Sequence, residues 1–130
     1  MKVLLTRTDL DSKHLARKLN DFGVTSVISP VIKIVSIPVE VPNKSDFQSI
    51  IITSKNTLET VKKLHFSEKV PIFCVGDITA KLFGNSGFSN VQSASGTSED
   101  LLELFVKSCR PEKGPVLYLA GQDTRGAIEK

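Results

Sequence analysis

Short apolar runs alternate with segments of helical periodicity along most of the chain. The runs are rich in Val and Ile and too short for buried helices, which favours β-strands. The segments between them repeat apolar residues every three or four positions, as amphipathic α-helices do. The predicted strands are residues 2–6, 24–29, 49–53, 71–75, 90–94 and 115–121. The predicted helices are residues 9–23, 56–66, 76–87, 97–109 and 122–130, the last of them cut off by the end of the sequence.

The first predicted helix, residues 9–23, has defined ends and one apolar face. Either Asp9 or Asp11 can cap its first turn, and Gly23 follows its end, where a left-handed residue is favoured. Its packing face is expected to consist of Leu15, Leu19 and Phe22. Because short connections join this helix to a strand on each side, the first part of the chain predicts a βαβ unit with parallel strands.

Two later helices have clearer signals. The helix at 56–66 places three apolar residues on one face, namely Leu58, Val61 and Leu64. The helix at 97–109 begins with Thr97 and Asp100 at the spacing of a capping box. Its expected inward face consists of Leu101, Leu104 and Phe105. Strands that alternate with helices predict an α/β fold with a mainly parallel sheet flanked by helices.

Residues 30–42 interrupt this rhythm. Pro30, Pro38 and Pro42 punctuate a segment in which Val and Ile alternate with other residues. Proline lacks the N–H group that a central strand needs, and it restricts the residue before it. The segment is therefore predicted to be extended, as either an edge strand or an interdomain connector.

Charge and composition exclude several classes of function. The net charge of +3 favours an anionic ligand slightly, but the lysines are scattered and no basic patch is interleaved with aromatic residues, so no nucleic-acid partner is expected. Cys74 and Cys109 form no C-x-x-C motif, and no disulfide is expected. The first apolar stretch is too short for a signal peptide or a membrane span. We therefore expect a cytoplasmic protein with no membrane partner.

Small, hydroxyl or glycine residues follow four of the predicted strands, at 6–9, 53–56, 75–80 and 120–125. Ligands of open parallel sheets bind beyond the carboxyl ends of the strands. Three of the four segments lead into helix starts, which carry unpaired N–H groups and a partial positive charge. Gly76 and Gly121 allow a ligand to approach the backbone closely. The pattern predicts a site for a carboxylate or a phosphate.

Each polar candidate also has a purely structural interpretation. Ser54 either caps the helix that follows it or binds a ligand anion. Thr79 either hydrogen-bonds to the carbonyl groups of its own helix or contacts a ligand. Arg7 suits a carboxylate through its planar fork, or it forms a surface ion pair. Arg125 is a weaker candidate, because its predicted helix is incomplete.

The sequence holds no nucleotide-binding glycine loop, no nucleophile elbow and no zinc-protease motif. His14 and His65 lie far apart on different predicted helices, so they do not predict a metal site. No metal or cofactor is expected, and no catalytic residue can be assigned.

The order of the strand-end motifs resembles that of the uroporphyrinogen-III synthase family. The matching segments are "LLTR" at 4–7, "ISP" at 28–30, "TSKNTLE" at 53–59, "VGDITAKL" at 75–82, "SEDLLELF" at 98–105 and "VLYLAGQDTR" at 116–125. The family fold implied by this resemblance has two α/β lobes joined by an extended connector, with the active cleft between them. Residues 1–35 would then be a βαβ portion of a discontinuous first lobe, 36–42 the connector, and 43–130 an incomplete, flavodoxin-like second lobe.

The resemblance implies an enzyme of tetrapyrrole synthesis that cyclises hydroxymethylbilane to uroporphyrinogen III, inverting the last ring and losing water without a metal or cofactor. The residues that it places against this linear tetrapyrrole are Arg7, Thr53, Ser54, Asn56, Gly76 and Thr79. Ser54 and Thr79 come first among them, as hydroxyl donors to the leaving group or to substrate carboxylates.

The resemblance also implies that the chain has about half the family's length. We therefore expect it to be nearly inactive alone and to show some self-association through the apolar strand faces of its βαβ portion. The alternative function, from a different class, is a non-catalytic flavodoxin-like module that binds a small anion or a protein partner.

Overall fold

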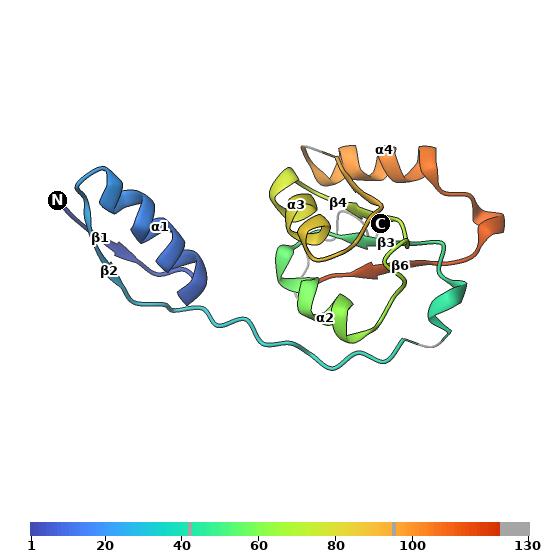
Figure 1. Cartoon of the computed structure of the whole chain (residues 1–130), viewed down its shortest axis with the longest axis horizontal. Helices are drawn as coiled ribbons and strands as arrows, with labels where there is room; N and C mark the ends of the chain where they lie inside the picture. The colour runs from blue at the N-terminus through green and yellow to red at the C-terminus, as the bar shows by residue number, and fades with distance from the viewer. Residues whose placement is uncertain (42, 95, 123–130) are drawn as a thin grey trace. The chain divides into compact units, whose positions relative to one another are not determined.

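The computed structural model describes residues 1–41, 43–94 and 96–122 (Figure 1). Its internal contacts divide the chain into two compact units, Met1–Ile37 and Pro38–Lys130. The predicted last helix lies outside the described residues apart from Gln122, and so does Arg125.

The first unit is the predicted βαβ unit. Strands β1 (Lys2–Leu5) and β2 (Thr25–Ile28) pair in parallel, and α1 (Asp9–Asp21) connects them. Gly23 has a φ of +71°, which is the left-handed conformation predicted for it. The prediction of parallel strands joined by one helix is confirmed here.

The start of α1 differs from the prediction. Thr8 is the N-cap, and its Oγ1 accepts a hydrogen bond from the Asp11 N–H at 3.4 Å. Asp9 and Asp11 lie inside the first turn, where their negative charges interact favourably with the positive end of the helix dipole. The prediction that one of these two aspartates caps the helix was therefore wrong.

The predicted packing face of α1 also differs. The residue that α1 buries completely is Ser12, whereas Leu15 is exposed and Phe22, the C-cap residue, is 84% exposed. Only Leu19 of the predicted face is half-buried. The helix turns a stripe that includes small side chains toward the strands, at positions 12, 16 and 19. A sheet of two strands gives the other apolar side chains no surface to pack on.

Residues 29–41 contain no helix or strand. The segment begins with two backbone hydrogen bonds back to the β1 side of the unit, from Ser29 N–H to Leu5 O and from Val31 N–H to Thr6 O. Beyond Pro42 the chain enters a short 3₁₀ turn, η1 (Lys44–Asp46).

The second unit holds a four-stranded sheet in which every pair of neighbouring strands is parallel. Its strands are β3 (Ser49–Ile52), β4 (Ile72–Cys74), β5 (Val91–Ser93) and β6 (Val116–Leu119), in the spatial order β5-β4-β3-β6. The α/β class with parallel strands flanked by helices is confirmed.

Helices cover both faces of this sheet, as the two core clusters show. On one face, Ile50 and Ile52 of β3 pack with side chains of α2 (Leu58–Lys63) and α3 (Asp77–Asn85). On the other face, Ile51 packs with Leu101 of α4 (Ser98–Ser108). Figure 1 shows α4 and α2 on opposite sides of the sheet. Two 3₁₀ turns, η2 (Lys55–Thr57) and η3 (Pro111–Lys113), complete the described elements of this unit.

Two predictions about the helices of this unit, one apolar face and one capping box, are confirmed. Leu58, Val61 and Leu64 are all buried. Thr97 and Asp100 form a reciprocal capping box, in which each side chain accepts the other's backbone N–H. The box also lowers the pKa of the exposed Asp100 carboxyl, first through the backbone N–H of Thr97 and then through its hydroxyl.

Phe83 should carry a large share of the packing that fixes α3 on the sheet. It is completely buried and lies against Phe88, with ring centroids 5.7 Å apart. We expect Phe83→Ala to lower the free energy of unfolding by about 3–5 kcal/mol, because it leaves a cavity in the core. The matched control is Leu82→Ala on the same helix, where the side chain is partly exposed and the loss should be about 1 kcal/mol or less. Urea unfolding monitored by circular dichroism measures both, and equal losses would contradict this account of the core.

Candidate functional site

The strand register brings the polar ends of the central strands to one edge of the second unit. Ile52 of β3 pairs with Cys74 of β4 on one side and with Leu119 of β6 on the other. Val75 continues the alignment, because its N–H donates to the Ile52 carbonyl at 3.3 Å. Thr53 therefore leaves the sheet beside Val75, at the same edge where the chain leaves β6.

The order of the strands adds a feature that no local sequence pattern predicts. From β3 the chain moves outward to β4 and β5 through α2 and α3, on one face of the sheet. It then returns across the other face through α4 and adds β6 on the far side of β3. The connections after β3 and before β6 thus lie on opposite faces. Parallel sheets bind their ligands at such a switch point, outside the carboxyl ends of the strands.

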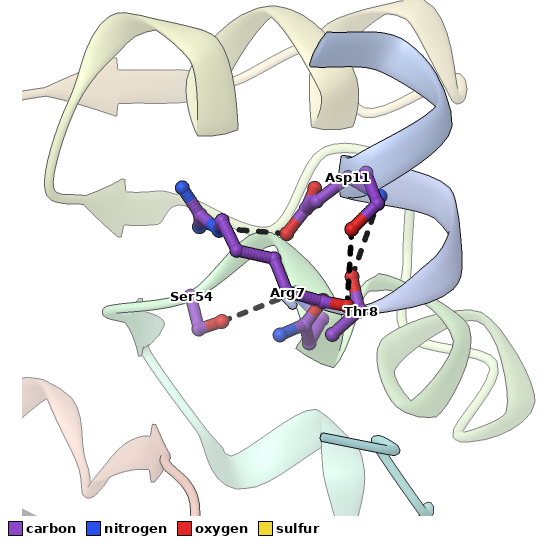
Figure 2. A network of polar contacts seen from close by, with 6 residues as sticks. Arg7, Thr8, Asp11 and Ser54 are labelled. Atoms are coloured by element: carbon purple, nitrogen blue, oxygen red, sulfur yellow. Dashed lines mark hydrogen bonds and ion pairs between the residues drawn. The ribbon is translucent and has the colours of Figure 1, made fainter. Parts of the chain in front are cut away.

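Ser54 lies at this switch point and is half-buried. Its Oγ accepts a hydrogen bond from the Asn56 N–H at 3.2 Å, so the capping interpretation of this residue is observed (Figure 2). Thr57 completes the turn by donating its hydroxyl to the Ser54 carbonyl at 2.8 Å. In these contacts the Ser54 hydroxyl acts only as an acceptor, which leaves its own O–H able to donate to a ligand.

The start of α3 forms the neighbouring part of the edge. Gly76 is the N-cap residue with a φ of +83°, and as a glycine it has no side chain with which to cap this helix. The first intrahelical hydrogen bond runs from the Ala80 N–H to the Gly76 carbonyl at 3.2 Å. Helix α3 contacts η2, the turn that begins after its N-cap residue Ser54.

Thr79 occupies the third position of α3 and is only 8% exposed. We see no bond from its hydroxyl to a carbonyl of its own helix in the part of the chain that the structure describes. Thr53, which leaves the sheet beside Val75, is half-buried, and Asn56 is exposed. The structure therefore brings Thr53, Ser54, Asn56, Gly76 and Thr79 to one edge.

Cys74 is the last residue of β4, next to this edge, but its thiol is unsuited to nucleophilic chemistry. Burial, with a smaller contribution from the negative charge of Asp77, raises the pKa of its thiol to about 11. The thiol donates to the Gln92 carbonyl at 3.5 Å. At neutral pH it is thus protonated and acts as a small buried side chain, because the thiolate is the reactive form.

Arg7 belongs to the first unit, where it follows β1. Its Nη2 lies 3.5 Å from Asp11 Oδ2, and the Arg7 side chain is 73% exposed, so the ion-pair interpretation of this residue is observed (Figure 2). A further hydrogen bond stabilises the turn around Arg7, because the buried Ser12 hydroxyl donates to the Arg7 carbonyl at 3.1 Å.

Thr8, the N-cap residue of α1, was not predicted from the sequence. Thr8 and Asp11 have the same three-residue spacing as the capping box of Thr97 and Asp100. Applying the capping-box rule at the first helix as well would have identified Thr8 as the cap.

Among residues 1–41, 43–94 and 96–122, no group of three or more His, Cys, Asp or Glu side chains is placed to hold a metal ion. Within the same ranges, no helix has both the length and the apolar character needed to span a membrane.

Comparison with known proteins identifies the family. A family model described as uroporphyrinogen-III synthase HemD matches residues 13–130, which include every candidate at the sheet edge. No curated protein matches the chain significantly. Since the family model covers most of the sequence, the chain belongs to the uroporphyrinogen-III synthase HemD family.

Proposed function

We propose that the protein binds hydroxymethylbilane and closes this linear tetrapyrrole to uroporphyrinogen III, with inversion of the last ring and loss of water. Family membership supports a role of this general kind. The observation that carries the proposal is the carboxyl edge of the sheet, where α3, which begins after the glycine N-cap Gly76, contacts the turn that follows Ser54 at the switch point.

The chemistry of the substrate matches this edge. Each of its pyrrole rings carries acetate and propionate side chains, so the ligand is a flexible polyanion. The N–H groups in the first turn of α3 have no carbonyl partner within the helix, and they lie at the positive end of the helix dipole. Gly76 has no Cβ and has open space around it, so a carboxylate can approach the backbone there.

In the proposed reaction, hydrogen bonding assists the departure of the substrate hydroxyl as water and leaves an azafulvene cation. Attack by a substituted pyrrole carbon then gives a spiro intermediate, which rearranges and closes the ring. The Ser54 and Thr79 hydroxyls donate hydrogen bonds to the leaving oxygen or to carboxylates, which stabilises charge as it develops. The larger task is to hold the two ends of a flexible chain together, and many weak contacts along one edge suit that task.

The proposal assigns Arg7 a substrate carboxylate, because its planar fork matches that group and its contact with Asp11 is long and largely exposed. It also keeps the division suggested by the family resemblance: residues 1–35 as part of a first lobe, 36–42 as a connector and 43–130 as a second lobe.

Loss of the edge hydroxyls should weaken substrate binding. We expect Ser54→Ala and Thr79→Ala each to raise the Kd for hydroxymethylbilane about 10- to 100-fold, as for a lost hydrogen bond to a charged group. The control is Ser45→Ala, which should leave Kd unchanged. Ser45 is exposed in the turn before β3, at the amino end of that strand and away from the proposed site. Titration calorimetry measures all three, and unchanged affinity in both edge variants would refute the proposed site. Because the chain is expected to be nearly inactive alone, affinity is the discriminating readout: equal binding of a small carboxylate and of hydroxymethylbilane would instead favour a non-catalytic anion-binding module.

Two glycines of the same helix test the backbone of the site. Gly76→Ala should destabilise the protein by about 1–2 kcal/mol, because an L-residue is strained at a φ of +83°. It should also weaken substrate binding, because the added methyl group faces the approach to the first turn. Gly84 lies in the last turn of α3, with equally open space and no positive φ, so Gly84→Ala should stabilise the protein by about 0.4–1 kcal/mol without changing Kd. Thermal unfolding and calorimetry of both variants check this, and a Gly76→Ala protein that binds as well as wild type would argue against backbone contact with substrate.

A further inference from the structure

Charged side chains are unevenly distributed along the carboxyl edge of the second unit. Asp77 follows β4, and Glu99 and Asp100 follow β5, all of them in the first turns of helices. Lys55 follows β3, and it is the one positively charged side chain among the described residues that come directly after the four strands. These residues are 53–56, 75–80, 94, 96–100 and 120–122. In the strand order β5-β4-β3-β6, the acidic side chains thus lie toward one end of the edge, and the cation lies toward the other.

The acidic side chains restrict where an anion can bind. The carboxylate of Asp100 is held in the capping box, where it accepts the Thr97 N–H at 2.7 Å. Burial, and then the negative charge of Asp77, raises the pKa of the Cys74 thiol, so the charge of Asp77 acts at the end of β4. A polyanion is therefore repelled from the β5 side of the edge. A carboxylate that binds at the start of α3 also meets Asp77 there, and it needs a compensating cation nearby.

Lys55 is held where that cation is needed. Its backbone is fixed by the turn after β3, because the Asn56 N–H donates to Ser54 Oγ at 3.2 Å and the Leu58 N–H donates to the Lys55 carbonyl. The turn η2, which begins at Lys55, contacts α3. In the described chain, Lys55 and Lys44 are half-buried, whereas every other lysine is exposed. Water and salt screen a half-buried charge less than an exposed one, so it attracts an anion more strongly.

We propose that Lys55 binds a carboxylate of the substrate and so determines where along the edge a polycarboxylate lies. The substrate's carboxylates gather on the β3 side, over residues 53–56 and the start of α3, and away from α4. A ligand with several carboxylates can reach Lys55 and the first turn of α3 together, whereas a small monocarboxylate reaches one of them. The inference rests on the proposed function for the identity of the tetrapyrrole, while the charges themselves point to polycarboxylates as the class of ligand.

Removal of this charge should weaken binding. We expect Lys55→Met to raise the Kd for hydroxymethylbilane about tenfold, because one charge-assisted contact is lost. Lys55→Arg keeps the charge and should restore most of the affinity. The matched control is Lys44→Met, because Lys44 is equally half-buried but lies in η1, at the amino end of β3, and its replacement should leave Kd unchanged. Titration calorimetry measures the three variants, and equal Kd values for Lys55→Met and Lys44→Met would overturn the proposal.

Ionic strength separates a lost charge from a disturbed turn. The Kd of wild type and of Lys55→Arg should rise with added salt, because salt screens the attraction between the cation and the carboxylate. The Kd of Lys55→Met should rise less steeply. If Lys55→Met binds more weakly but keeps the salt dependence of wild type, the residue acts on the shape of the turn and the proposal is rejected.

A second ligand separates this inference from the proposed function. Benzenehexacarboxylate carries carboxylates around a rigid ring and has no tetrapyrrole chain to close. If wild type binds it in a manner that depends on Lys55 but does not bind hydroxymethylbilane, the role of Lys55 stands and the proposed function is wrong. If hydroxymethylbilane binds equally well to wild type and to Lys55→Met, the proposed function stands and the role of Lys55 is rejected. If wild type binds neither ligand, both are rejected.

Discussion

The parallel pairing of β3 with a strand on each side is the constraint on which the site depends. One residue, Ile52, is in register with Cys74 and with Leu119, so three strands end at the same level. Parallel strands point all their carboxyl ends in one direction, and the helices that follow start at that edge. A shift of register in either pair would separate Thr53 from Val75 and would move the start of α3 away from the Ser54 turn. The polar edge is thus a consequence of backbone pairing between apolar strands.

Burial on both faces explains why the chemistry is confined to strand ends. All four residues of β3 are buried, and even the polar Ser49 is enclosed, 3.3 Å from the Cys109 sulfur. A central parallel strand covered by helices leaves no side chain exposed along its length. Polar groups can therefore reach solvent only where the strand stops, at Thr53 and Ser54. Packing at Phe83 and Leu101 holds the helices on the two faces and so keeps this edge in place.

Sequence patterns predicted the second unit well because its signals are local and agree with its packing. The buried face of α2 and the capping box of α4 were both readable from spacing alone. Strand order was not readable, because it is decided by which helices cover which face, and the switch point between β3 and β6 follows from that order. The roles of Ser54 and Arg7 were left between two interpretations. The structure shows the cap and the ion pair, and neither contact uses up the group's capacity to donate to an anion.

The errors in the first unit have a common physical cause. The periodicity of α1 predicted that Leu15 and Phe22 would pack inward, which assumes a surface broad enough to receive them. The unit has two strands, and α1 places the small Ser12 against them instead. The same shortage of partner surface leaves the alternating Val and Ile residues of 31–39 exposed. The failed prediction for α1 and the exposed apolar residues that follow β2 therefore have one cause, which is that the first unit carries more apolar surface than two strands and one helix can cover.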